Sequence, residues 1–106
     1  MNGETLLAEA IAMKDEIVGN RRTIHRAPEV GAHLPQTVEF VEKRLQELGY
    51  EPCELGGGVA AEITGEDTGR CILLRADMDA LKVEEKTGLP FRSENGCMHA
   101  CGHDMH

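Results

Sequence analysis

Apolar positions in the first half of the chain recur at helical spacing. Between about Gly3 and Arg26, the charged residues fall largely between the apolar ones, which predicts one amphipathic helix. Pro28 ends this helix, because the residue before a proline is pushed out of the α region. A second helix is expected from near Pro35 to Leu48, with a glycine cap at position 49. Its predicted buried face is Val38, Val41, Leu45 and Leu48.

The second half of the chain changes to short strands and turns. Glu51 to Glu54 fits a short strand, and Gly56-Gly57-Gly58 fits a turn. Val59 to Thr64 and Cys71 to Arg75 predict two strands, joined as a hairpin by the turn from Gly65 to Gly69. In the last of these strands the run from Cys71 to Leu74 is continuously apolar, as expected of a strand covered on both faces. Helices followed by strands indicate an α/β fold in which helices pack on a sheet.

Composition narrows the class of protein. With 106 residues, the chain (1–106) forms one domain at most, or a piece of one. It has 19 acidic and 11 basic residues and a formal net charge of −8, which argues against a nucleic-acid partner because phosphate binding needs a basic face. The start does not resemble a signal peptide, and no apolar run approaches the roughly 20 residues of a membrane span. We therefore expect a soluble, cytoplasmic protein with reduced cysteines.

Potential metal ligands are concentrated between Met98 and His106. Cys101 and His103 stand two residues apart, so an extended backbone would point both side chains to the same side. A thiolate and an imidazole favour zinc or another late first-row divalent metal over magnesium or calcium. A Cys-x-His pair is common, however, so the spacing leaves metal binding and an ordinary surface role open. For His99, a surface or hydrogen-bonded role is favoured.

Two carboxylates, Asp77 and Asp79, follow directly after the apolar strand. In open α/β sheets, ligands bind in the crevice at the carboxyl ends of the strands. Carboxylates in that place can hold a metal-bound histidine or shift the pKa of a neighbour. An acidic loop with Arg75 as its internal counter-ion explains the same residues.

Two other polar segments have structural interpretations. His25 to Glu29 is interpreted as a helix exit followed by a turn. Glu84-Glu85 could suggest an acid/base pair, but it lies between Lys82 and Lys86 and is interpreted as a solvated segment.

Four segments occur in order along the chain: His25-Arg26-x-Pro28-Glu29, Arg75-Ala76-Asp77-Met78-Asp79-Ala80-Leu81, Thr87-Gly88-Leu89-Pro90-Phe91 and Met98-His99-Ala100-Cys101-Gly102-His103-Asp104. Together they resemble the M20 metallopeptidase family, specifically its amidohydrolase branch, which includes hippurate hydrolases and N-acyl-amino-acid deacylases. The resemblance spans nearly the whole chain from about Glu16 onward. One such motif is weak support, whereas four in the family's order and approximate spacing are strong.

The resemblance implies roles for single residues. Cys101 and His103 would be the first two ligands of a metal site, with His99 and Asp104 in supporting positions. Asp77 and Asp79 stand in place of the family's His-x-Asp signature, so both are expected to be active-site carboxylates with separate roles left open. The implied metal is zinc, with manganese, cobalt and nickel as alternatives.

The implied reaction is hydrolysis of the amide bond of a small N-acyl amino acid. The metal would activate the attacking water, and a glutamate would transfer its proton to the leaving amine.

The resemblance also implies a fold and an extent. The expected fold is a partial zinc-aminopeptidase-like catalytic domain, truncated before an inserted domain that often serves dimerisation, so a homodimer is the implied assembly of the full-length protein. The family's remaining ligands and its glutamate pair lie beyond His106. We therefore expect the N-terminal part of an amidohydrolase, inactive alone. The alternatives are a non-catalytic metal-binding or assembly module and one half of a split enzyme.

Overall fold

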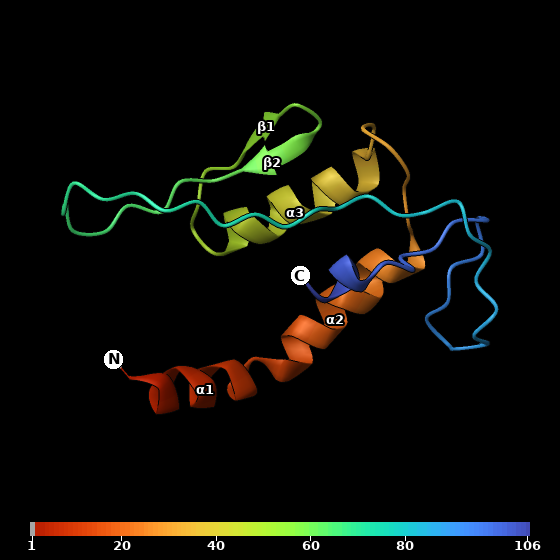
Figure 1. The fold of residues 1–106 in the computed structure, drawn as a ribbon, viewed down its shortest axis with the longest axis horizontal. Coiled ribbons are helices and arrows are strands. Elements are labelled where there is room, and N and C mark those ends of the chain that lie inside the picture. The colour runs from red at the N-terminus through yellow and green to blue at the C-terminus, as the bar shows by residue number, and fades with distance from the viewer. Residues whose placement is uncertain (1) are drawn as a thin grey trace.

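The computed structural model describes residues 2–106 and contains helices, one short hairpin and long extended segments (Figure 1). The hairpin lies next to α3, while the C-terminal end of the chain lies beside α2 (Figure 1). In chain order the elements are α1 (Gly3–Ala12), α2 (Lys14–Arg26), α3 (Pro35–Glu47), β1 (Cys53–Leu55), β2 (Gly58–Ala60) and the 3₁₀ helix η1 (Gly102–Met105).

The prediction of one continuous helix from about Gly3 to Arg26 is wrong, because this segment forms two helices, α1 and α2. Met13, with φ −88° and ψ 1°, ends α1 and precedes α2. Its N–H is shared between the carbonyls of Glu9 and Ala10, each at 3.2 Å, which is the tightening typical of a helix end.

The second helix is confirmed as α3, but its predicted buried face is only partly correct: Val38 is buried, Val41 and Leu45 are half-buried, and Leu48 is 57% exposed. Gly49 follows it with φ 89° and donates to the carbonyl of Gln46 at 2.9 Å, as expected of a glycine at this position.

The small core lies where the exit from α2 meets the start of α3. Glu29 caps α3, because its Oε1 accepts from the amide of Thr37 at 2.7 Å and from the hydroxyl of the same residue at 2.8 Å. The backbone carbonyl of Glu29 accepts from the amide of Ala80 at 2.7 Å. The helix exit predicted for residues 25–29 is confirmed. Through Glu29 it connects the end of α2 with the start of α3 and with the chain at Ala80. The buried apolar residues are Pro28, Leu34, Val38 and Ala80.

The strand predictions are correct only in part. β1 and β2 pair antiparallel, with Cys53 opposite Ala60. Gly56 and Gly57, at φ 59° and 87°, form the two-residue turn between them, a position that requires positive φ. The hairpin predicted between 59–64 and 71–75 is wrong. Residues 71–75 belong to no strand, and no partner strand in the described part of the chain pairs with them.

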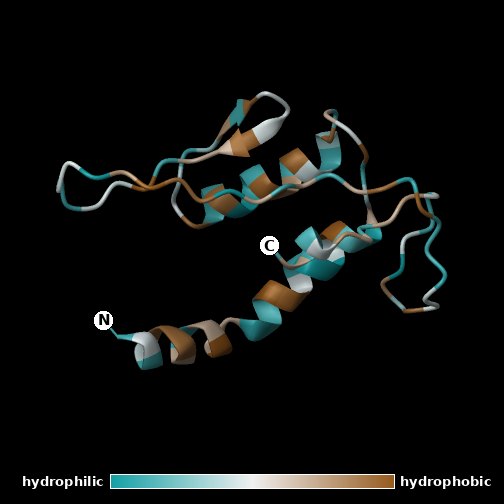
Figure 2. Ribbon diagram, viewed as in Figure 1, coloured by the Kyte–Doolittle hydropathy of each residue, from teal (hydrophilic) through white to brown (hydrophobic). Residues whose placement is uncertain are grey.

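Residues 72–74 are an exposed apolar segment. Their side chains are 85–90% exposed, although the run had predicted a strand covered on both faces. In Figure 2 this hydrophobic stretch passes along the molecule without a covering layer. The radius of gyration is 15.7 Å, whereas a compact domain of this length is expected near ~13 Å. Residues 72–74 thus have the apolar character of a buried strand, but no other part of residues 2–106 packs over them.

Two expectations from composition concern bonding and membranes. All four cysteines are free thiols in the structure, and the reduced state stays a prediction. Within residues 2–106, no helix combines the length and the apolar character that crossing a bilayer requires.

Glu85 is a buried carboxylate, so its interpretation as part of a solvated segment is wrong. Its side chain is 0% exposed and its Oε1 lies 2.7 Å from Nε2 of His25. The hydroxyl of Thr87 donates to Oε2, and the amide of Ser93 donates to Oε1 at 3.0 Å. Together with the ring of His25, these donors lower the pKa of Glu85 from 4.5 to about 2. This carboxylate ties α2 to the loop of residues 85–93.

Acid should weaken the fold through Glu85. A carboxyl whose pKa is lowered on folding stabilises the native state above its ordinary pKa of 4.5, and this contribution is lost as the pH falls toward about 2. We expect Glu85→Gln to unfold more readily at neutral pH and to lose part of the wild type's pH dependence in this range. Urea unfolding followed by circular dichroism from neutral pH downward measures both. The control is Glu84→Gln, at the exposed neighbouring carboxylate. Equal behaviour of the two variants would contradict the assignment.

The exposed run should bind a hydrophobic dye. We expect the fluorescence of anilinonaphthalene sulfonate to rise with the wild-type chain and to fall with Ile72→Lys/Leu74→Lys, because charges replace two apolar side chains that are 85% and 87% exposed. Thr68→Lys adds charge to the same exposed region without removing apolar surface, and it should leave the signal unchanged. A double variant with wild-type fluorescence would show that the run is covered in solution.

Candidate active-site cleft

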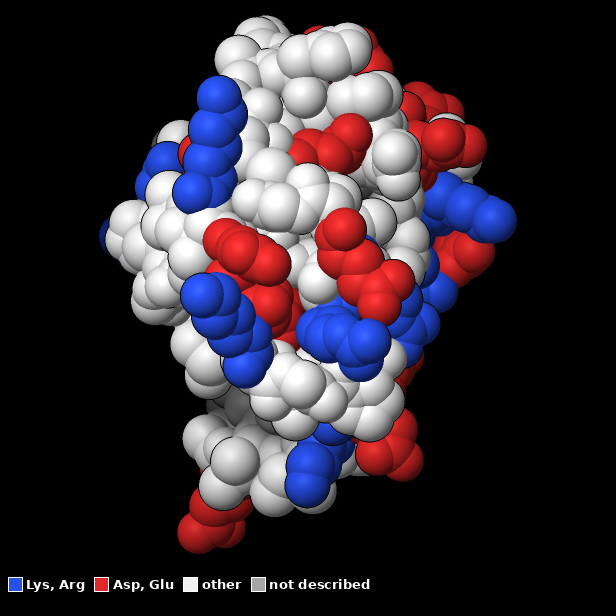
Figure 3. Space-filling model, turned by 90° about the vertical axis from the view of Figure 1, so that its right-hand side faces the viewer, with Lys and Arg blue, Asp and Glu red and all other residues white. Residues whose placement is uncertain are grey.

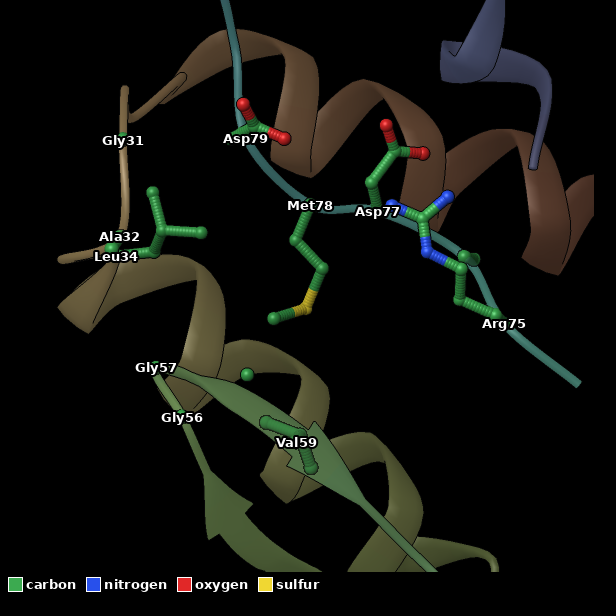
Figure 4. Close-up of a pocket in the computed structure, with 12 residues that line it drawn as sticks. Gly31, Ala32, Leu34, Gly56, Gly57, Val59, Arg75, Asp77, Met78 and Asp79 are labelled. Carbon is green, nitrogen blue, oxygen red and sulfur yellow. The ribbon is translucent and has the colours of Figure 1, made fainter. Parts of the chain in front are cut away.

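The segment after the apolar run is extended, and its side chains alternate between two sides. Figure 4 shows Met78 pointing toward the hairpin, while Asp77 and Asp79 point away from it. The cavity on the Met78 side has a volume of about 240 Å³ and is lined by residues 31, 32, 34, 56–59 and 75–79, so both aspartates border it although their carboxylates point away from it. The two predicted carboxylates therefore project from the opposite side of the segment.

On that side lies a small cleft of about 30 Å³. It brings together all four residues that the sequence predicted as site residues. Its lining is Asp77, Asp79, His99, Cys101, His103 and Asp104. Residues 77–79 and 99–104 are far apart in the sequence, so their meeting in one cleft is a result of the fold.

His103 is held by Asp77. Its Nδ1 lies 2.9 Å from Oδ2 of Asp77. Because an ionised carboxylate only accepts hydrogen bonds, Nδ1 carries the proton and donates it. This hydrogen bond lowers the pKa of the Asp77 carboxyl. In a neutral ring with its proton on Nδ1, Nε2 carries the lone pair through which an imidazole binds a metal.

Cys101 precedes a 3₁₀ turn rather than continuing an extended strand. It has φ −89° and ψ 150° and is the N-terminal flanking residue of η1, so the extended backbone assumed for residues 101–103 ends at Cys101. The thiol of Cys101 is exposed and unbridged. Both Cys101 and His103 nevertheless line the same cleft.

Asp79 and His99 also line the cleft. Neither the carboxylate of Asp79 nor Nε2 of His99 forms a hydrogen bond with another described residue. Nε2 of His99 is buried and has no partner within residues 2–106. Burial lowers the pKa of His99, which keeps its ring neutral at pH 7. The cleft therefore contains a second imidazole nitrogen whose hydrogen-bonding capacity is unused.

Asp104 bonds to α2 and not to an imidazole. Both Nε and Nη2 of Arg21 donate to Oδ2 of Asp104, at 3.0 and 2.6 Å. Arg21 could not be predicted as part of this region, because it stands 83 residues from its partner and outside every motif. It belongs nonetheless to the surroundings of the cleft.

The donor set suits a late first-row divalent metal but is incomplete in number. Thiolate, imidazole and carboxylate are the ligand types of zinc sites, and a catalytic zinc takes about three protein ligands. Among residues 2–106, no group of three or more histidine, cysteine or acidic side chains is arranged to hold one ion. Cys101 and His103 thus fit part of a site.

Charges of both signs are mixed on the face shown in Figure 3. Acidic and basic side chains alternate over it and do not gather into a basic stripe. Such a surface is unlike the continuous positive face of nucleic-acid-binding proteins.

Comparison with known proteins shows what these residues are similar to. Residues 73–106 match the family model described as Peptidase family M20/M25/M40. The resemblance to the M20 family is confirmed. The match begins within the exposed apolar run and contains both candidate carboxylates and both candidate ligands.

Curated M20-like relatives extend the similarity toward the start of the chain. N-acetyl-L-cysteine deacetylase of Bacillus subtilis (strain 168) is 47% identical over 89% of this chain and 23% of its own length. N-acyl-L-amino acid amidohydrolase of Geobacillus stearothermophilus is 38% identical over 89% of this chain and 26% of its own. The chain therefore spans about a quarter of the length of these relatives.

A solved M20 structure shares the fold. The crystal structure of the Bacillus subtilis YXEP protein, described as a dinuclear metal binding peptidase from the M20 family, superimposes with a TM-score of 0.82. The two chains are 40% identical, and the match covers 90% of this chain and 28% of the other. The expected α/β class, with helices beside a small sheet, is confirmed as part of an M20 peptidase fold.

The tautomer of His103 tests the geometry of the cleft. We expect long-range ¹H–¹⁵N NMR spectra of the metal-free chain to show the Nδ1–H form, because Asp77 accepts from that nitrogen. Asp77→Asn should shift the population away from Nδ1–H. Asp79→Asn, at the neighbouring carboxylate on the same side of the segment, should leave it unchanged. A wild-type ring in the Nε2–H form would contradict the contact.

Proposed function

We propose that this chain provides part of the metal site of an amidohydrolase that acts on N-acyl amino acids. The observation that carries the proposal is the cleft in which Asp77 holds Nδ1 of His103 beside the free thiol of Cys101. Cys101 and His103 are proposed as metal ligands, and Asp77 and Asp79 as active-site carboxylates.

The roles of the two carboxylates differ in this proposal. Asp77 orients His103 and keeps its Nε2 available, which is the usual part of a carboxylate behind a metal-bound histidine. Asp79 projects from the same side of the segment and has no competing partner in the described chain. We propose that the Asp79 carboxylate is the one that lies nearest the substrate or the ion.

Zinc is the proposed metal, with manganese, cobalt and nickel as the alternatives. A thiolate and an imidazole favour these ions over magnesium and calcium. When bound, such an ion polarises an amide carbonyl and lowers the pKa of water. The described residues contribute to that chemistry by holding His103 in one tautomer and by placing negative charge on one side of the cleft.

The proposed substrate class rests on the relatives. Two of them are named as deacetylase and amidohydrolase of N-acyl amino acids. Because the chain spans about a quarter of their length, the proposal assigns it a share in the site rather than the whole reaction. Residues 1–106 are accordingly proposed as the N-terminal part of an M20-type catalytic domain. Placement in the cytoplasm remains a prediction from the sequence, and assembly into a homodimer remains a prediction of the resemblance.

A second candidate function is a non-catalytic metal-binding or assembly module. One observation favours it: within residues 2–106, the potential ligands do not form a group of three around one point. This candidate predicts metal binding without amide hydrolysis, and the first candidate predicts metal binding that is needed for hydrolysis.

Zinc binding tests both candidates. We expect the purified chain to bind one zinc ion in competition with a chromophoric chelator, and Cys101→Ala/His103→Ala to lose at least about 100-fold in affinity, because ligand loss should exceed the 10–100-fold cost of losing an outer contact. The matched control, Cys53→Ala/His33→Ala, removes one exposed thiol and one exposed imidazole away from the cleft. It should bind as the wild type does.

The outcome separates the candidates from a purely structural protein. Equal zinc affinity of the wild type and the Cys101→Ala/His103→Ala variant would refute the proposed site. Tight binding that the double variant loses would support the metal site under both candidates. Chelator-sensitive release of amine from N-acetyl-L-cysteine by the purified chain would favour the amidohydrolase and would overturn the expectation that residues 1–106 are inactive alone.

A further inference from the structure

We propose that Arg21 is a positioning residue for the candidate metal loop, acting through Asp104 to fix the turn that carries Cys101 and His103. The inference rests on the proposed function in one respect, because positioning matters only if this loop binds a metal. Arg21 itself touches neither candidate ligand in a recorded hydrogen bond or ion pair. Its effect must therefore pass through the carboxylate.

The contact is specific in geometry. Two nitrogens of the Arg21 guanidinium, Nε and Nη2, donate to the same oxygen of Asp104 at 3.0 and 2.6 Å. Hydrogen bonds between charged groups are stronger than neutral ones. The Asp104 side chain is 15% exposed, so it is largely shielded from water, whereas Arg21 is 41% exposed. Because water partly screens the arginine, we expect a moderate and not a large effect.

Asp104 is part of the turn by its backbone as well as by its side chain. Its amide donates to the carbonyl of Cys101 at 3.0 Å, and the amide of His106 donates to the carbonyl of His103 at 2.9 Å. Fixing Asp104 therefore fixes both the start of η1 at Cys101 and the orientation of the residue before it. Asp77 holds that preceding residue, His103, by its ring. Two neighbouring residues of the loop are thus held from two separate parts of the chain.

Arg21 lies on a face of α2 that is itself held in place by a buried contact. His25 stands four residues later on the same helix face, and it is buried against Glu85 at 2.7 Å. That face of α2 therefore binds the 85–93 loop through one residue and the metal loop through the other. Movement of the C-terminal turn relative to the core would have to break the Arg21–Asp104 contact.

The first test needs no metal. Amide hydrogen exchange followed by NMR reports the hydrogen bonds that the Asp104 and His106 amides make in the turn. We expect Arg21→Ala to speed exchange at both amides several-fold, and Arg21→Lys to restore part of the protection through a single charged donor. Lys14→Ala removes the same charge from α2 without a recorded partner and should match the wild type. Unchanged exchange in Arg21→Ala would overturn the proposal.

The second test separates positioning from general stability. We expect zinc affinity to fall by about tenfold in Arg21→Ala, the lower end of the 10–100-fold range for contacts behind a metal ligand. In an Asp104→Asn background, Arg21→Ala should cause little further loss, because its route to the loop is already weakened. Equal losses in both backgrounds would overturn the proposed route. A third outcome is that Arg21→Ala exchanges faster but the wild type binds no zinc. That outcome would support the contact between Arg21 and Asp104 and refute the proposed function.

Discussion

The carboxylate of Glu85 is the contact on which the arrangement of this chain depends. It is buried beside His25 and accepts from three groups, so a helix near the start of the chain is tied to a loop 60 residues later. Few apolar side chains are buried, and the molecule is more extended than a compact domain of its length. Polar contacts therefore determine much of its tertiary structure. A buried carboxylate is tolerated because its oxygens have donors.

Polar contacts also determine where the candidate site lies. The side chains of the cleft come from two segments, which are joined by the paired backbones of Leu81 and Met98 and by the contact between His103 and Asp77 across 26 residues. Arg21 adds a further connection, from α2 to the loop of residues 101–104. The cleft is thus formed by charged and polar contacts around a loop, and not by the packed edge of a sheet. This explains why the metal chemistry proposed for Cys101 and His103 depends on residues that lie outside their motif.

The parts of this structure that the sequence predicted are local or carried by motifs. The helix α3 and its glycine end follow from apolar spacing and one conformational requirement, and the structure confirms both. The four predicted site residues do meet at one cleft, although their roles remain proposals. The family resemblance, drawn from four ordered segments, is confirmed over about nine-tenths of the chain.

What the sequence did not predict depends on distant partners. Glu85 lies between two lysines and resembles a solvated residue, but its burial is decided by His25 and Ser93. The apolar run at 72–74 predicts a covered strand, because hydrophobicity indicates the need for cover and cannot state which residues provide it. The pairing of Arg21 with Asp104 joins residues of ordinary surface type, so composition and spacing carry no trace of it.

The central claim is that Cys101 and His103 bind the same ion, and X-ray absorption of the zinc-loaded chain tests it most directly. We predict one sulfur ligand at about 2.3 Å and at least one nitrogen ligand at about 2.0 Å in the fine structure. The sulfur signal should disappear in Cys101→Ala and persist when Cys53 is replaced. A zinc shell made only of oxygen and nitrogen in the wild type would contradict the claim, because the thiol of Cys101 would then have no part in the site.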